Sequence, residues 1–174
     1  MAYRCDFHLN GGRRRLIVAR GAQETFDNLA LRLAACALFW ELEPQLEISP
    51  KHPALAAVEF RPDFIALDQA GDVKMWGECG NTSMNKLDKL TRKYPGARLV
   101  VLKADPREGA KQREDLVHDV ERHAKVEVFS FQPGDFAAWR DAVDEVTEIF
   151  GESDERNLNL VVNNTPLACH LLSH

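Results

Sequence analysis

The sequence predicts a single α/β domain, in which helices flank a mixed β-sheet and strand pairs lie near both ends of the chain. Segments in which apolar and polar residues alternate, as in strands, are interspersed with segments of helical periodicity. The run ARLVVLK at 97–103 is continuously apolar, as in a strand buried on both faces. No repeat or linker divides the 174 residues, and their hydrophobic share of 45% is enough for one core.

The expected elements begin with a hairpin. Residues 3–10 and 14–19 alternate β-branched or aromatic residues with polar ones around Gly11-Gly12. A helix is expected over 23–42, and its apolar residues cover so wide an arc that it should be central. The proline-rich stretch 43–57 reads as a connection.

The rest of the chain continues the alternation of strands and helices. Strands are expected at 59–68 and 73–80, and a helix at 84–94 that begins after Thr82 or Ser83 and ends at Pro95-Gly96. The elements expected after it are a strand at 97–103, a polar helix near 107–123, a strand at 126–131, an acidic helix near 135–149, and two strands, LNLVV and PLACHLL, around Asn163-Asn164.

Composition restricts the class of protein. A formal net charge of −5 argues against a dedicated nucleic-acid binder. The four cysteines lie far apart with no C-x-x-C pair, which favours reduced thiols over a zinc cluster or disulfides. The N-terminus lacks the pattern of a signal peptide, and no apolar run approaches the length of a membrane helix. We therefore expect a soluble, cytoplasmic protein without a membrane partner; its oligomeric state stays open.

Two carboxylates lie within the strand segments at 59–68 and 73–80. If Gln69–Asp72 forms the hairpin turn, or if the turn is Ala70-Gly71 alone, Asp68 faces Val73. Antiparallel pairs keep a constant index sum, so the same register places Asp63 directly opposite Glu78 on one face. A three-residue turn would shift this register.

This pair suggests a cation site. Like charges that face each other are destabilising unless something bridges them, and a divalent cation is the simplest bridge. Mg²⁺ or Mn²⁺, held by Asp63, Glu78 and the backbone carbonyl of Cys79, would suit a site with few carboxylates and several waters. The plainer alternative is that Asp63 and Glu78 form structural salt bridges with Arg61, Lys74 or Lys86.

A basic segment at 86–103 follows the carboxylates. On the expected helix, Lys86, Lys89 and Lys93 lie beside the buried stripe, and Lys86 is nearest to its boundary. Its aliphatic stem allows it to reach over Gly80 toward the carboxylates. Such a run is otherwise an ordinary solvated helix face.

These residues resemble a known family. Pro62-Asp63, fourteen intervening residues and then Glu78-Cys79-Gly80 resemble the P-D…(D/E)-x-K signature of restriction-endonuclease-like nucleases, with Gly80 at the lysine position. The segment ARGAQETFDNLALRLAACALF, with PDF…WGECG…KLDKL, is similar to the YaeQ family. The resemblance implies one YaeQ-like domain over 1–174 with a restriction-endonuclease-like core. It also implies that Glu24 joins Asp63 and Glu78, and that Lys86 or Lys89 supplies the missing lysine.

Two hypotheses of function remain open. In the first, the chain is a Mg²⁺- or Mn²⁺-dependent nuclease whose basic segments, 86–103 and Arg13–Arg15, hold the phosphates of DNA or RNA. Lys86 would then orient the attacking water or stabilise the charge that develops on phosphate. In the second, the chain is a catalytically silent binding or regulatory module that keeps the carboxylate cluster. Glu24, near a helix start, is equally typical of a capping acid.

Overall fold

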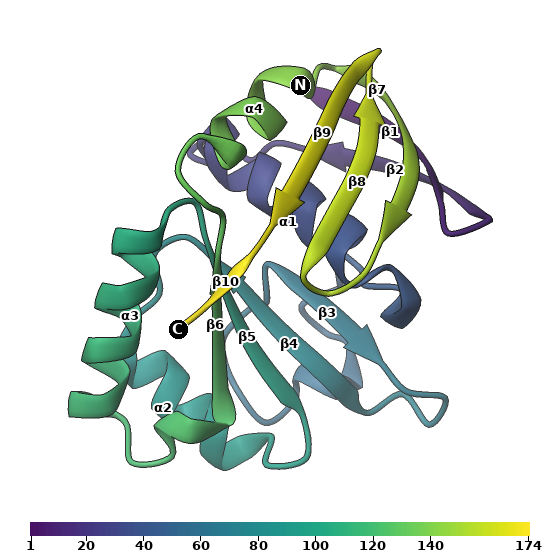
Figure 1. The fold of residues 1–174 in the computed structure, drawn as a ribbon. Helices are drawn as coiled ribbons and strands as arrows, with labels where there is room; N and C mark the ends of the chain where they lie inside the picture. The colour runs from purple at the N-terminus through teal and green to yellow at the C-terminus, as the bar shows by residue number, and fades with distance from the viewer.

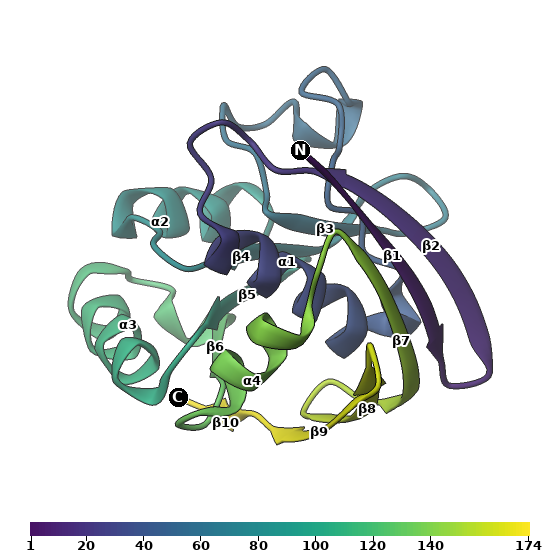
Figure 2. The ribbon, with the colours of Figure 1, turned by 90° about the horizontal axis from the view of Figure 1, so that it is seen from above.

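The computed structural model describes all 174 residues, which form two five-stranded sheets with a helix packed between them (Figure 1). The first sheet has the strand order β2-β1-β7-β8-β9, and the second has the order β10-β6-β5-β4-β3. Seen from above, α1 (Phe26–Leu38) lies between the sheets, while α2 (Met84–Lys93) and α3 (Pro106–Asp119) cover the far face of the second sheet (Figure 2).

The second sheet is mixed. The β3–β4 pair and the β6–β10 pair are antiparallel, whereas β4–β5 and β5–β6 are parallel and are connected through α2 and α3. Its strands are β3 (Phe64–Leu67), β4 (Val73–Cys79), β5 (Arg98–Lys103), β6 (Val126–Ser130) and β10 (Leu172–Ser173).

Helices on both faces explain the continuous apolar run in β5. Val100 and Leu102 belong to the core that contains α1, whereas Leu99 and Val101 belong to a second core beneath α2 and α3. The expectation of a strand buried on both sides is therefore confirmed. A sheet covered on both faces exposes mainly its strand ends to solvent, which makes the ends of β3 and β4 the places where polar side chains gather.

The helix expected to be central is confirmed. Thr25 caps α1 by accepting a hydrogen bond from the Asn28 amide at 3.2 Å, and every residue from Leu29 to Leu38 is buried. The helix is shorter than expected, because the chain turns at Phe39. Short 3₁₀ turns follow at Trp40–Leu42, and further along at Pro53–Leu55 and His123–Lys125.

The first sheet joins both ends of the chain. The hairpin of β1 (Ala2–Leu9) and β2 (Gly12–Ala19) turns at Asn10 and Gly11, whose φ angles of 52° and 78° suit a two-residue turn. At the other end, β7 (Val146–Ser153) pairs with β1 in parallel, and β8 (Asn157–Val162) and β9 (Thr165–His170) extend the sheet antiparallel.

One expectation was wrong, and the joining of the terminal strand pairs was not foreseen. The acidic helix near 135–149 ends early, because α4 spans only Asp135–Ala142 and the following residues form β7. Thr147 and Ile149 are buried while Val146, Glu148 and Phe150 are exposed, which is the period of a strand. The expected mixed sheet is present as the second sheet, and the strand pairs near the two ends of the chain form a further sheet, because β7 joins them. No helix of the structure has the length and apolar character needed to cross a membrane.

Candidate catalytic cleft

Asp63 and Glu78 meet where β3 begins and β4 ends. Phe64 pairs with Gly77 and Ala66 with Met75, which is the register expected from the sequence. The Asp63 amide donates to the Gly77 carbonyl at 3.0 Å, and Asp63 Oδ2 accepts a hydrogen bond from the Cys79 amide at 2.7 Å. Asp63 is thus fixed against the end of β4, next to Glu78.

The turn itself differs from the expectation. The Asp68 amide bonds to the Asp72 carbonyl at 2.9 Å, so that the loop contains three residues, with Gly71 at a φ of +85°. Past the turn Leu67 pairs with Val73, one position out of the expected register. A bulge between Ala66 and Leu67, opposite Lys74, absorbs this shift. The longer turn and the bulge shift the register in opposite directions, so the expected register holds from Ala66 to Phe64, next to Asp63.

Glu78 is a buried carboxylate with an ammonium partner. Its side chain is 4% exposed, and its Oε1 accepts from Trp76 Nε1 and from Lys86 Nζ, each at 2.7 Å. Burial raises the pKa of Glu78 to about 7; Lys86 opposes this change, and the neighbouring Asp63 adds to it. At neutral pH this carboxyl group therefore exists in both protonation states.

Asp63 differs in having no counter-ion. No lysine, arginine or histidine nitrogen lies within 4 Å of its carboxylate. Burial raises the pKa of Asp63, although the hydrogen bond from Cys79 lowers it in part. A half-buried carboxylate with one hydrogen bond and no ion pair retains the capacity to bind a cation.

Lys86, and not Lys89, reaches the carboxylates. Ser83 caps α2 by accepting from the Lys86 amide at 3.2 Å, and this places the Lys86 side chain over the end of β4. Its Nζ also donates to the Arg61 carbonyl at 3.2 Å. Lys89, one turn further along α2, is held by Glu59 at 2.6 Å and does not line the cleft.

Glu24 lines the same cleft but is bound to Arg32. The two side chains are 2.9 Å apart, and Glu24 Oε2 also accepts from the Gly21 amide at 3.1 Å. Arg32, which is 9% exposed, donates further to the carbonyls of Asp63 and Leu46. Arg32 was not expected at the site. The signal for it is its place as the single charged residue in the apolar stretch LALRLAACAL.

Gly80 occupies a backbone conformation that disfavours a lysine. Its φ of +71° favours glycine, and a Cβ atom there would lie 3.3 Å from Asn28 Oδ1. The ammonium of Lys86 therefore arrives from α2, six residues further along the chain than Gly80.

The cleft has a volume of about 480 Å³ and an acidic lining. Glu24, Asp27, Asp63, Glu78 and Glu108 line it, and Lys86 is its single basic residue. No group of three histidine, cysteine, aspartate or glutamate side chains is placed to hold a metal ion. Burial raises the pKa of the Cys79 thiol well above its usual range, so only the backbone carbonyl of Cys79 is available as a ligand. Two carboxylates and a carbonyl remain, and this donor set, completed by water, would suit Mg²⁺.

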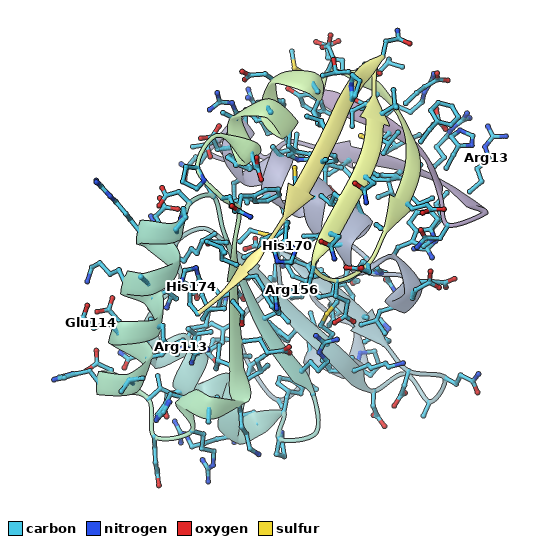
Figure 3. All side chains as sticks on the ribbon, in the orientation of Figure 1. Arg13, Arg113, Glu114, Arg156, His170 and His174 are labelled. Atoms are coloured by element: carbon cyan, nitrogen blue, oxygen red, sulfur yellow. The ribbon has the colours of Figure 1, made fainter.

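The segments expected to hold nucleic-acid phosphates are largely engaged in contacts within the protein. Arg92 pairs with Asp88, Arg98 binds Glu127 and Glu155, and buried Lys103 donates to the Gly80 carbonyl. Arg14 lies over the Trp40 ring, and Arg15 binds Asp6. Lys93 and Arg13 have no ion-pair partner, and Arg13 projects outward near the tip of the β1–β2 hairpin (Figure 3).

Comparison with known proteins agrees with this fold. The crystal structure of the YaeQ protein from Xanthomonas axonopodis pv. citri superimposes with a TM-score of 0.77 and 14% identity, and covers 99% of this chain and 97% of that one. The YaeQ protein from Pseudomonas syringae gives a TM-score of 0.74 at 15% identity, over 99% of this chain and 94% of that one. No curated protein matches the chain. The family model described as YaeQ protein matches residues 11–169, and the chain therefore belongs to the YaeQ family.

Proposed function

We propose that the chain is a divalent-metal-dependent nuclease that hydrolyses phosphodiester bonds in the cleft of Asp63, Glu78 and Lys86. The observation that carries the proposal is the combination of a carboxylate without a counter-ion and a buried carboxylate with an ammonium group, both at the ends of one hairpin. The four strands β3 to β6, with helices on both faces, support a restriction-endonuclease-like core.

The charge of the cleft explains the need for a metal ion. A phosphodiester is an anion, and five acidic side chains with one lysine would repel it. Bound Mg²⁺ or Mn²⁺ would neutralise that repulsion and lower the pKa of a coordinated water. Asp63, Glu78 and the Cys79 carbonyl are the groups that would hold the ion.

The other residues have positioning roles in this proposal. Lys86 Nζ, fixed between Glu78 and the Arg61 carbonyl, is placed to orient the attacking water or to balance charge on the phosphate. Arg32 holds Glu24 and the Asp63 backbone, so that it sets the position of both acids without facing the reacting atoms.

The alternative is a catalytically silent binding or regulatory module. The observation that favours it is that Lys86 already neutralises Glu78 and Arg32 already neutralises Glu24. In this case the cluster would stabilise the fold or bind an ion, without catalysis.

A paired measurement of metal binding and cleavage tests the proposal. Mg²⁺ or Mn²⁺ at about 100 times its Kd should stabilise the wild type by roughly 2.7 kcal/mol, which thermal unfolding detects. Mn²⁺ should also support cleavage of DNA or RNA, offered in single- and double-stranded form. Asp63→Asn should abolish most of the metal response, and Asp63→Asn and Glu78→Gln should both abolish cleavage.

Lys89→Met is the matched control, because Lys89 lies on the same helix but binds Glu59 outside the cleft. It should leave cleavage near the wild-type rate, whereas Lys86→Met should reduce it strongly. A metal-dependent shift without cleavage would favour the silent module. Absence of both responses in the wild type would rule out the nuclease.

A further inference from the structure

A second pocket lies beside the carboxylate cleft, at the N-terminus of α2. It has a volume of about 420 Å³ and is bounded by the loop 81–84, by Lys103 at the end of β5, and by the face of α3 that carries Glu108 and Gln112. Asn81 and Glu108 line both this pocket and the carboxylate cleft. The two cavities are therefore adjacent parts of one depression.

The loop that lines this pocket contains peptide N–H groups without hydrogen-bond partners. Ser83 caps α2 through the Lys86 amide, and the Leu87 amide bonds to the Ser83 carbonyl at 3.1 Å. None of the amides from Asn81 to Asn85 donates a hydrogen bond within the protein. Free amides at a helix N-terminus, together with the helix dipole, attract an anion.

Two side chains of the lining, Thr82 and Gln112, have polar groups without adequate hydrogen-bond partners. Gln112 is 5% exposed, and its carboxamide makes only a weak contact, from Nε2 to Met84 Sδ at 3.8 Å. Thr82 Oγ1 is shielded from solvent and has no hydrogen-bond partner. Buried polar groups in folded proteins nearly always have partners, so the Thr82 hydroxyl and the Gln112 carboxamide keep hydrogen-bonding capacity for a ligand in this pocket.

The lining carries two lysines and two acids, of which only Lys111 and Asp115 form an ion pair. Lys103 is 5% exposed, its Nζ donates to the Gly80 carbonyl, and burial lowers its pKa. Lys111 and Asp115 neutralise each other at 3.1 Å. Glu108 remains as an unpaired acid at the boundary with the carboxylate cleft.

We propose that this pocket is a phosphate-binding subsite, in which the loop amides, Thr82, Gln112 and Lys103 hold the oxygens of a phosphate group. A tetrahedral oxyanion accepts many hydrogen bonds at once, which matches this concentration of donors. The phosphate is either the free ion or a phosphate group of a nucleotide. The subsite does not depend on the nuclease activity, because its binding requires neither metal nor turnover.

Titration of the metal-free protein with inorganic phosphate, followed by amide NMR, tests the proposal. The amide signals of residues 81–85 should shift together, with saturation that defines a Kd. Lys103→Met should weaken binding by about tenfold or more, as expected for loss of a hydrogen bond from a charged group. Thr82→Val and Gln112→Leu should each weaken it by about fivefold.

Two further variants complete the design. Lys125→Met repeats the lysine substitution at an exposed position outside the pocket and should leave the Kd unchanged. Glu108→Gln removes a negative charge and should tighten binding. If Lys103→Met does not fold, the Thr82 and Gln112 variants decide the question, because neither side chain has a strong partner to lose.

The source of the phosphate is resolved by a dinucleotide with and without a 5′-phosphate. Tighter binding of the phosphorylated form than of inorganic phosphate assigns the subsite to a nucleotide, whereas equal binding of the two assigns it to the free ion. If the loop amides do not respond to phosphate, or if every variant binds like the wild type, the subsite does not exist. Neither result would bear on metal-dependent cleavage.

Discussion

Asp6 in the first sheet and Glu78 in the second are both buried carboxylates with a basic partner, but their pKa values shift in opposite directions. They are 4% and 3% exposed, and each binds a basic side chain, Arg15 at 2.6 Å for Asp6 and Lys86 at 2.7 Å for Glu78. The hydrogen bond from Arg15 lowers the pKa of Asp6, whereas burial raises the pKa of Glu78 to about 7.

The surroundings explain the difference. Asp6 is covered by Arg4 and Arg15, whose side chains are 47% and 52% exposed, so that water stays close to the ion pair. Glu78 lies beneath a lysine that is 19% exposed, with Asp63 as a second acid beside it. A salt bridge therefore does not by itself identify a structural role. A carboxyl group that is kept from ionising freely, in a cleft, is typical of a functional site.

The largest expected effect is that of Lys86→Met. This change leaves the Glu78 carboxylate buried without its ammonium partner, and we expect a loss of about 3 kcal/mol in the free energy of unfolding at pH 8. At pH 5 the loss should be much smaller, because protonated Glu78 needs no counter-ion. Urea unfolding at both pH values measures the difference. Lys89→Met, which breaks an exposed pair, should cost less than about 1 kcal/mol.

The next effect is the pH dependence that Glu78 imposes on stability. Its pKa is higher in the folded state, about 7, than the ordinary value of 4.5, so the unfolded chain releases its proton first as pH rises. The free energy of unfolding should therefore fall between about pH 4.5 and 7, by at most about 3 kcal/mol. Glu78→Gln should remove this decline. A profile in which the variant and the wild type run parallel would contradict the raised pKa.

The smallest effect is expected at Asp6. Its pKa is lowered in the folded protein, so its stabilising contribution is present above the ordinary value of 3.8 and is lost as pH falls below it. Asp6→Asn should flatten the acid side of the stability profile, and from pH 5 to 8 it should lower the free energy of unfolding by a constant amount without changing the slope. Because the ion pair is close to water, 1 M salt should also reduce its contribution. If Asp6 changed the pH dependence of the free energy of unfolding near neutral pH as much as Glu78 does, the two carboxylates would not differ.

The sequence predicts the elements around the site better than the contacts within it. The apolar run in β5 and the wide apolar arc of α1 are strong local patterns, and both were interpreted correctly. The register of Asp63 and Glu78 was also correct, but through two compensating differences, a longer turn and a bulge at Lys74. Bulges depend on how two strands twist against their neighbours, and no single strand encodes that.

The missed features depend on distant parts of the chain. β7 has the alternation of a strand, but it follows a short acidic helix, and its partner β1 lies at the other end of the sequence. Lys89, like Lys86, lies beside the buried stripe of α2, but its ion pair with Glu59, thirty residues earlier, holds it outside the cleft. The burial of the charged Arg32 side chain is explained by its ion pair with Glu24 and by two carbonyl groups that accept hydrogen bonds from it, and the fold brings all of these together.

The parallel pairing of β1 with β7 also governs the order of folding. β1 contacts β7 from Arg4 with Val146 to Leu9 with Gly151, so the first sheet closes only when nearly the whole chain is available. Until then the apolar surface of α1 that this sheet covers has no partner. Contacts of such long sequence separation slow folding and lengthen the exposure of apolar surface. During synthesis the N-terminal hairpin therefore waits for the C-terminal strands, whereas strands β3 to β6 of the cleft-bearing sheet are available before β7 or β10 has been made.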